Sequence, residues 1–127
     1  MVDIVDRYSE ILNIKYPGMI SVPPGWKHLV DALLDELLLQ NNLGYPCKVY
    51  QIKEKWGELR IGLVSHFVDH YRPLISLAER MSKHICQISG APGTLRDING
   101  WLMVLSDEEY DKKVGNNVVF DVPCSIC

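Results

Sequence analysis

The spacing of apolar residues switches from a helical period to a strand period and back along the chain, and this switch limits the fold to the α+β class. Between residues 25 and 41 the apolar positions recur at steps of three and four, as the buried face of a helix requires. Those positions are Trp26, Leu29, Val30, Leu33, Leu34, Leu37 and Leu38. Residues 47–55 instead alternate between apolar and polar, which is typical of a half-buried strand. The helical period returns between residues 69 and 89.

Two alternating runs predict a β-hairpin. The first run ends at Lys55, and residues 59–63 repeat the alternation. Between them lie Trp56, Gly57 and Glu58. Glycine can adopt the positive φ that a tight turn needs, so we expect a hairpin over residues 49–64 with Gly57 in the left-handed region.

Glycine, proline and capping residues give the bounds of the other elements. A short first helix is expected over residues 2–13, and the helix at 69–89 tolerates Pro73 because proline is allowed in a first turn. The apolar run at residues 101–105 has the length of a buried strand. Residues 118–122 are expected to add a last strand.

Ser106 predicts the start of another short helix, which would end at Lys113. Glu109 stands three positions after Ser106, which is the spacing of a capping box. With the elements above, this gives one domain, residues 1–127, because a chain of this length buries one sizeable core but seldom two. We expect an α+β fold in which three main helices pack on one face of a small, mainly antiparallel sheet built from the 49–64 hairpin and the 101–105 strand.

The charge balance argues against a general nucleic-acid binder. The formal net charge is −3, and the 13 Lys and Arg residues are spread along the chain without a run. A basic or neutral protein partner fits this balance better. The first six residues contain two acids and no basic residue, unlike a secretory signal. The chain also lacks the roughly 18 consecutive apolar residues of a membrane span. We therefore expect a cytoplasmic protein without a membrane partner.

The histidines, serines and glycines do not form a catalytic motif. The four histidines, at positions 28, 66, 70 and 84, are scattered, and no serine lies in a Gly-x-Ser-x-Gly elbow. The glycine-rich run at 90–93 contains Pro92, which lacks the amide that a phosphate cradle would use, so this run is interpreted as a turn. We expect a protein that is not an enzyme and needs no cofactor.

The cysteines leave one alternative open. Cys124 and Cys127 have the two-residue gap of half a zinc knuckle, and His84 with Cys86 could supply the other half. The pair lies in the last four residues, where chains tend to fray, and one such pair constrains a site only loosely. We therefore expect no metal. Without an export signal the cysteines, including Cys47, are expected to be reduced.

An acidic cluster follows Ser106 and has two interpretations. Asp107, Glu108, Glu109 and Asp111 would lie in the first turns of a helix, where acids interact favourably with the helix dipole. They would also attract a basic partner and speed its association. Asp107, Glu108 and Asp111 are therefore candidate partner-binding residues.

Tryptophans supply the other candidate contact. Trp26, Trp56 and Trp101 are expected to pack in the core or in turns. Trp56 also lies at the predicted hairpin tip, where an aromatic side chain makes a good interface anchor. Trp56 therefore joins the candidate partner-binding residues.

Several of these segments together resemble a family of small uncharacterised proteins that are common in phages and prophages. The resemblance covers roughly residues 25 to 109. It is carried by Gln51-Ile52-Lys53-Glu54-Lys55-Trp56-Gly57-Glu58-Leu59-Arg60, by Ala78-Glu79 and Ser82 before Cys86, and by Gly90-Ala91-Pro92-Gly93 with Arg96, Gly100 and Trp101.

In that family a Cys-x-x-Cys knuckle and a later Cys-x-x-His pair look like a small zinc site. The resemblance places its four ligands at Cys86, Ser89, Ser106 and Glu109 of this chain. Serine is a poor zinc ligand at neutral pH, so the resemblance implies a zinc site that has lost most of its ligands.

The sequence as a whole favours binding over catalysis. The expected function is a small acidic module that binds and inhibits another protein, most concretely an immunity protein that neutralises a toxin. The alternative is a phage or prophage accessory domain derived from a zinc-binding module and associated with nucleic acid.

Overall fold

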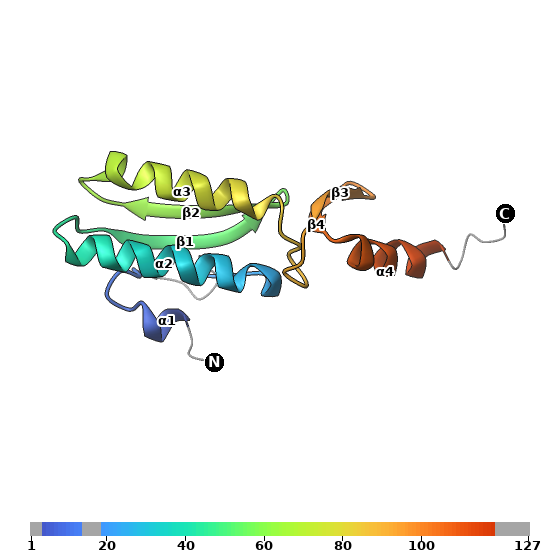
Figure 1. Cartoon of the computed structure of the whole chain (residues 1–127), viewed down its shortest axis with the longest axis horizontal. Helices are drawn as coiled ribbons and strands as arrows, with labels where there is room; N and C mark the ends of the chain where they lie inside the picture. Colours follow the sequence, from blue (N-terminus) through green and yellow to red (C-terminus); the bar gives the residue numbers. More distant parts are fainter. Residues whose placement is uncertain (1–3, 14–18, 119–127) are drawn as a thin grey trace.

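The computed structural model describes residues 4–13 and 19–118 and shows an α+β fold with two small sheets (Figure 1). In chain order the elements are α1 (Ile4–Arg7), η2 (Pro24–Trp26, a 3-10 helix), α2 (Lys27–Asn42), β1 (Lys48–Lys55), β2 (Glu58–Val64), α3 (Val68–Ser82), β3 (Thr94–Ile98), β4 (Trp101–Leu105) and α4 (Asp107–Val118). No helix in these described segments is both long and apolar enough to cross a membrane.

The strands form two separate antiparallel hairpins, β1–β2 and β3–β4. The predicted hairpin over residues 49–64 is confirmed, and Gly57 has the expected positive φ of +77°. The prediction that the 101–105 strand joins the first sheet is wrong. Asn99 and Gly100, with φ of +54° and +87°, form a two-residue turn that pairs β4 with the strand directly before it.

The helix bounds differ from the prediction at several ends. The described part of the first helix covers only Ile4–Arg7, and Leu12 already forms a bridge with β1. α3 ends at Ser82 rather than at 89, because the chain then turns so that Ile85 pairs with Pro92. α4 continues beyond Lys113 to Val118, so Val118 is helical, and the rest of the predicted strand at 118–122 lies outside the described residues.

The main core lies between helices α2 and α3 and the β1–β2 hairpin. Its fully buried side chains include Val30, Leu34 and Leu37 from α2, and Ile52 and Leu59 from the hairpin. The second hairpin and α4 extend beyond one end of this layered part (Figure 1).

One tryptophan connects the two parts. Trp26 is completely buried, and its indole Nε1–H donates a hydrogen bond of 2.8 Å to the carbonyl oxygen of Ile85. Ile85 lies in the segment between α3 and β3, so this bond ties the start of α2 to the chain that leads into the second hairpin. The prediction that Trp26 packs in the core is confirmed.

Candidate functional site

The turn of the first hairpin places Trp56 in an unusual backbone conformation. Trp56 and Gly57 are the two central residues, and both have positive φ, +58° and +77°. Asn, Asp and Gly dominate such turns, whereas a bulky side chain in the left-handed region is uncommon. The Gly57 N–H donates a 2.8 Å hydrogen bond to the Glu54 carboxylate, which supports the turn. The Trp56 side chain nevertheless remains 64% exposed.

Trp101 lies just after the turn of the second hairpin and is 67% exposed. It is therefore not part of the core. The first turn rests on the second hairpin, because a Cβ added to Gly57 would lie 2.5 Å from Leu95 Cδ1 and 3.6 Å from the backbone of Leu102. This close approach brings the turns of the two hairpins near each other.

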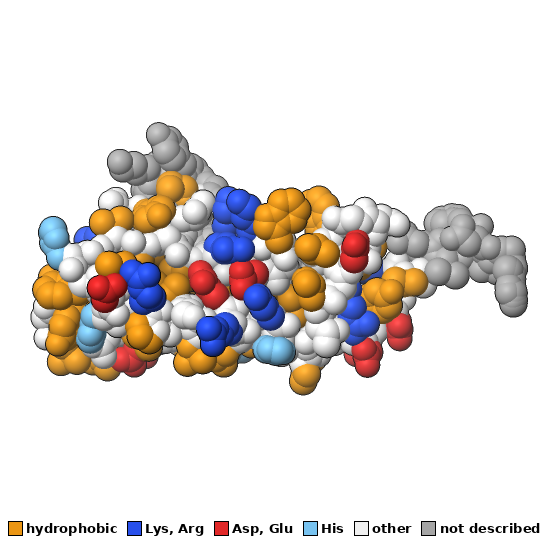
Figure 2. All heavy atoms as spheres, turned by 90° about the horizontal axis from the view of Figure 1, so that it is seen from above, with side chains coloured by type: hydrophobic (Ala, Val, Ile, Leu, Met, Phe, Trp, Pro, Cys, Tyr) orange, Lys and Arg blue, Asp and Glu red, His pale blue; other side chains and the backbone are white. Residues whose placement is uncertain are grey.

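Between them the hairpins form a groove of about 280 Å³. We call it the tryptophan groove. It is lined by Glu54, Lys55, Trp56, Gly100, Trp101 and Leu102. Figure 2 shows one face of the molecule, on which hydrophobic side chains gather toward both ends of the described part and mixed Lys, Arg, Asp and Glu side chains lie between them. The lining combines the indole rings of Trp56 and Trp101 with the apolar Leu102 and with two charged side chains, Glu54 and Lys55. Exposed tryptophans of this kind are common anchors of protein interfaces.

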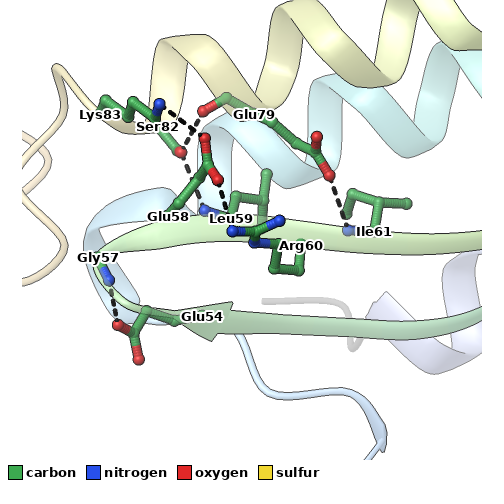
Figure 3. A network of polar contacts seen from close by, with 9 residues as sticks. All are labelled: Glu54, Gly57, Glu58, Leu59, Arg60, Ile61, Glu79, Ser82 and Lys83. Atoms are coloured by element: carbon green, nitrogen blue, oxygen red, sulfur yellow. Dashed lines mark hydrogen bonds and ion pairs between the residues drawn. The ribbon is translucent and has the colours of Figure 1, made fainter.

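A polar network connects the first hairpin to the end of α3 (Figure 3). It includes Glu54, Glu58 and Arg60 from the hairpin and Glu79 and Ser82 from α3, so these residues have a role in the fold. The backbone N–H of Leu59 donates to Ser82 Oγ at 3.0 Å, and that of Ile61 donates to Glu79 Oε2 at 3.3 Å. Both N–H groups lie on the outer edge of β2, so α3 satisfies donors that would otherwise lack a partner.

The same network contains an ion-pair cluster. Glu58 accepts ion pairs from Arg60 and from Lys83, each at 3.0 Å. The Arg60 and Lys83 side chains are about half exposed, so each pair adds at most about 1 kcal/mol to stability. The Lys83 pair links the end of α3 to β2, and the Arg60 pair lies within β2.

Cys86 lies in a small polar turn near the end of α3. It is completely buried, and the backbone N–H of Ser89 donates to its sulfur at 3.4 Å. Burial raises the pKa of the Cys86 thiol, but hydrogen bonds from the Ser89 side chain and from the backbones of Ser89, Ser106 and Ile88 outweigh it and lower the pKa to about 7. The turn thus stabilises a thiolate.

The structure brings together Cys86, Ser89 and Ser106, three of the positions that the resemblance assigns to zinc. His84, by contrast, is exposed, and Cys124 and Cys127 lie outside the described residues. In the described part of the chain, no three His, Cys, Asp or Glu side chains gather as a metal site would require.

The acidic cluster begins α4, as expected. Ser106 Oγ accepts the backbone N–H of Glu109 at 3.2 Å, which forms one half of the predicted capping box. Asp107, Glu108 and Asp111 are exposed.

Two of these acids already have cationic neighbours. Asp107 contacts Arg96 at 2.6 Å, and Glu108 lies 3.7 Å from Lys112. These ion pairs reduce the field that the cluster offers to a partner. Asp111 has no ion pair among the described residues, so it contributes the freest negative charge of the three.

Trp56 is therefore the predicted site residue that lies in a formed groove, whereas the three acids lie on α4 and are not among the groove's lining residues. Sequence reasoning missed Trp101 and Leu102 as groove residues. The signal that points to them is the Asn99-Gly100 pair, which predicts a second hairpin with its own tip. No family model, curated protein or solved structure matches the chain.

Proposed function

We propose that the protein is a binding module that docks on another protein through the tryptophan groove. The observation that carries this proposal is the conformation of Trp56, which is strained and 64% exposed at once. A non-glycine residue in the left-handed region costs roughly 1–2 kcal/mol, and Asn or Gly would avoid most of that cost. Strain at an exposed aromatic side chain is typical of a functional position.

The chemistry of the groove fits a protein partner. Tryptophan is among the residues that contribute most to protein interfaces, because its large rigid side chain buries area at a small entropic cost. Trp56, in the first turn, and Trp101, directly after the second turn, together present two such side chains. A partner side chain placed between them would be desolvated on both sides.

In its most concrete form the proposal is that the protein inhibits a toxin, as an immunity protein does. The exposed Asp107, Glu108 and Asp111 then act as a second contact that steers a basic partner. Steering charges act mainly on the association rate. Replacing these three acids by Asn, Gln and Asn, with Glu109 left in place as part of the cap, should slow association and weaken its salt dependence.

One observation favours the alternative of a nucleic-acid partner. Lys53 lies directly opposite Arg60 in the β1–β2 register, and Lys55 lines the groove beside Trp56. Arg60 is ion-paired with Glu58, so the cation that bears on this alternative is Lys55. Cations beside aromatic rings are typical of single-stranded nucleic-acid binders. This arrangement makes an oligothymidylate a necessary second probe.

The decisive experiment uses Trp56→Asn. Asparagine suits the left-handed region, so the turn should be kept while the anchor is removed. Leu43→Asn is the matched control, because Leu43 is 63% exposed just after α2 and does not line the groove. A partner captured by the parent chain should bind Trp56→Asn at least roughly tenfold more weakly and Leu43→Asn unchanged.

Equal binding by both variants would exclude the groove as the docking surface. Binding of the oligothymidylate that disappears in Trp56→Asn, without any protein partner, would support the nucleic-acid alternative instead.

A further inference from the structure

The two-residue turns determine which backbone groups of each hairpin point outward. The pair that closes such a turn exchanges both backbone hydrogen bonds, and bonded and non-bonded pairs then alternate along the ladder. In the first hairpin the closing pair is Lys55 and Glu58. The backbone N–H and C=O groups of Leu59 and Ile61 therefore point away from β1. The bonds of their N–H groups to α3 side chains agree with this assignment.

Three of the four strands have part of this outer edge occupied. On β2 the occupants are the α3 side chains described above. On β1 the carbonyl oxygen of Ile52 accepts the N–H of Ser21 at 2.8 Å. On β4 a single residue, Gln87, acts as a neighbouring strand would: its N–H donates to the Val104 carbonyl at 2.9 Å, and its side-chain oxygen accepts the Val104 N–H at 3.0 Å.

β3 differs from the other three strands. The closing pair of its hairpin is Ile98 and Trp101, so the outward residues of β3 are Leu95 and Asp97. In the described part of the chain, no group outside the hairpin bonds to their backbone N–H or C=O. Both residues are exposed, Leu95 to 53%. The strand has a regular register and contains no proline, lysine or bulge; the protections that it does have are its short length of five residues and the exposed charge of Asp97.

We propose that β3 accepts an extended segment of a partner protein as an added strand. The N–H groups of Leu95 and Asp97 would donate to two carbonyls of that segment, and their C=O groups would accept two of its N–H groups. Leu95 provides the side-chain contact, so the segment carries an apolar residue opposite it. This proposal goes beyond docking at the tryptophan groove, because it needs no contact with Trp56.

A second copy of the chain fits this edge poorly. Antiparallel pairing of two β3 strands must place outward residues opposite outward residues. One such register places Leu95 of each copy opposite the Asp97 carboxylate of the other, and another places the two Asp97 side chains opposite each other, so neither register brings favourable side chains together. A register centred on Leu95 places Asp97 opposite Gly93, whose N–H already donates to His84. The edge therefore favours a different chain.

The probe for this proposal is a peptide selected on the purified full-length protein from a displayed library of random peptides. Its affinity is measured for the parent, Leu95→Ala and Leu95→Pro. Alanine removes the side chain and keeps the N–H, whereas proline removes both, and an outward-facing edge position tolerates proline. We expect Leu95→Pro to bind roughly tenfold more weakly than Leu95→Ala, and Trp56→Asn to bind like the parent.

A second measurement keeps the test valid if Leu95→Pro does not fold. Methylation of the peptide's backbone nitrogens, one at a time, should weaken binding to the parent chain at alternate residues only, because alternate N–H groups face β3. Four results would overturn the proposal: no enriched peptide, equal loss for alanine and proline with no alternation, loss in Trp56→Asn instead, or sedimentation of the chain alone as a dimer that Leu95→Pro dissociates.

Discussion

The contact between the two hairpins can be tested at Gly57, because the second turn supplies an internal control. Gly57 and Gly100 occupy equivalent turn positions with φ of +77° and +87°. A Cβ at Gly100 would meet nothing within 4 Å, whereas a Cβ at Gly57 would lie 2.5 Å from Leu95 Cδ1. Alanine at both positions therefore carries the same backbone strain, and only Gly57→Ala adds a steric conflict.

The expected magnitudes follow from these two terms. Gly100→Ala should lower the free energy of unfolding by about 1–2 kcal/mol, the cost of the left-handed conformation for a residue with a Cβ. Gly57→Ala should cost about 1 kcal/mol more, at the lower end of the range for overpacking, because the half-exposed Leu95 side chain can move. Each kcal/mol corresponds to roughly 3–5 °C in Tm for a chain of this size.

The assay is urea unfolding of the parent, the two glycine-to-alanine variants, Leu95→Ala alone, and each glycine variant combined with Leu95→Ala. Removing Leu95 should recover the extra cost of Gly57→Ala and should leave the cost of Gly100→Ala unchanged. If both alanine variants lost the same stability, and if neither coupled to Leu95, the first turn would not rest on the second hairpin. The geometry of the tryptophan groove would then have to be abandoned.

Three further predictions test the polar contacts. Ser82→Ala should lower the free energy of unfolding by about 1–3 kcal/mol in chemical denaturation, because it leaves the buried Leu59 N–H without its acceptor. The pKa of the Cys86 thiol is lowered from 9.0 to about 7 in the folded chain, so the free energy of unfolding should increase as pH rises from about 7 to 9 and decrease as pH falls through the same range. In melting curves recorded at several pH values, Cys86→Ser should show a smaller increase. Elemental analysis of untagged protein, purified without chelator, should find no stoichiometric zinc, and one zinc per chain would contradict the loss of ligands at positions 89 and 106.

The elements with a repeating apolar pattern could be predicted from the sequence. The elements whose bounds depend on local turns were harder to predict. α2 and the first hairpin follow directly from period and from Gly57. β3 was not predicted, because its residues Thr94-Leu95-Arg96-Asp97-Ile98 are largely exposed and do not form a buried apolar face. The end of α3 was misplaced because Ile85 and Cys86 in the following turn are also partly or fully buried, and burial alone does not separate a turn from a helix face.

The tryptophan groove was only half predictable. The position of Trp56 at a hairpin tip followed from the alternating runs on either side of it. The exposure of Trp101 did not, because its neighbours Leu102, Met103, Val104 and Leu105 form an apolar run that is typical of a buried strand. Trp101 lies in the groove because the first turn approaches the second hairpin, and that approach depends on contacts far apart in sequence.

The division into two hairpins has a consequence for how the molecule opens. From Thr94 to Gly115 only Val104, Leu105 and Ser106 are buried, whereas the α2, α3 and β1–β2 layers contain most of the core. Regions with few buried apolar side chains open locally at a lower free energy than the core does. Amide hydrogen exchange should therefore resolve two cooperative units, with β3, β4 and α4 exchanging through openings that leave the amides of α2 protected. The bond from Trp26 to Ile85 would mark the boundary between them.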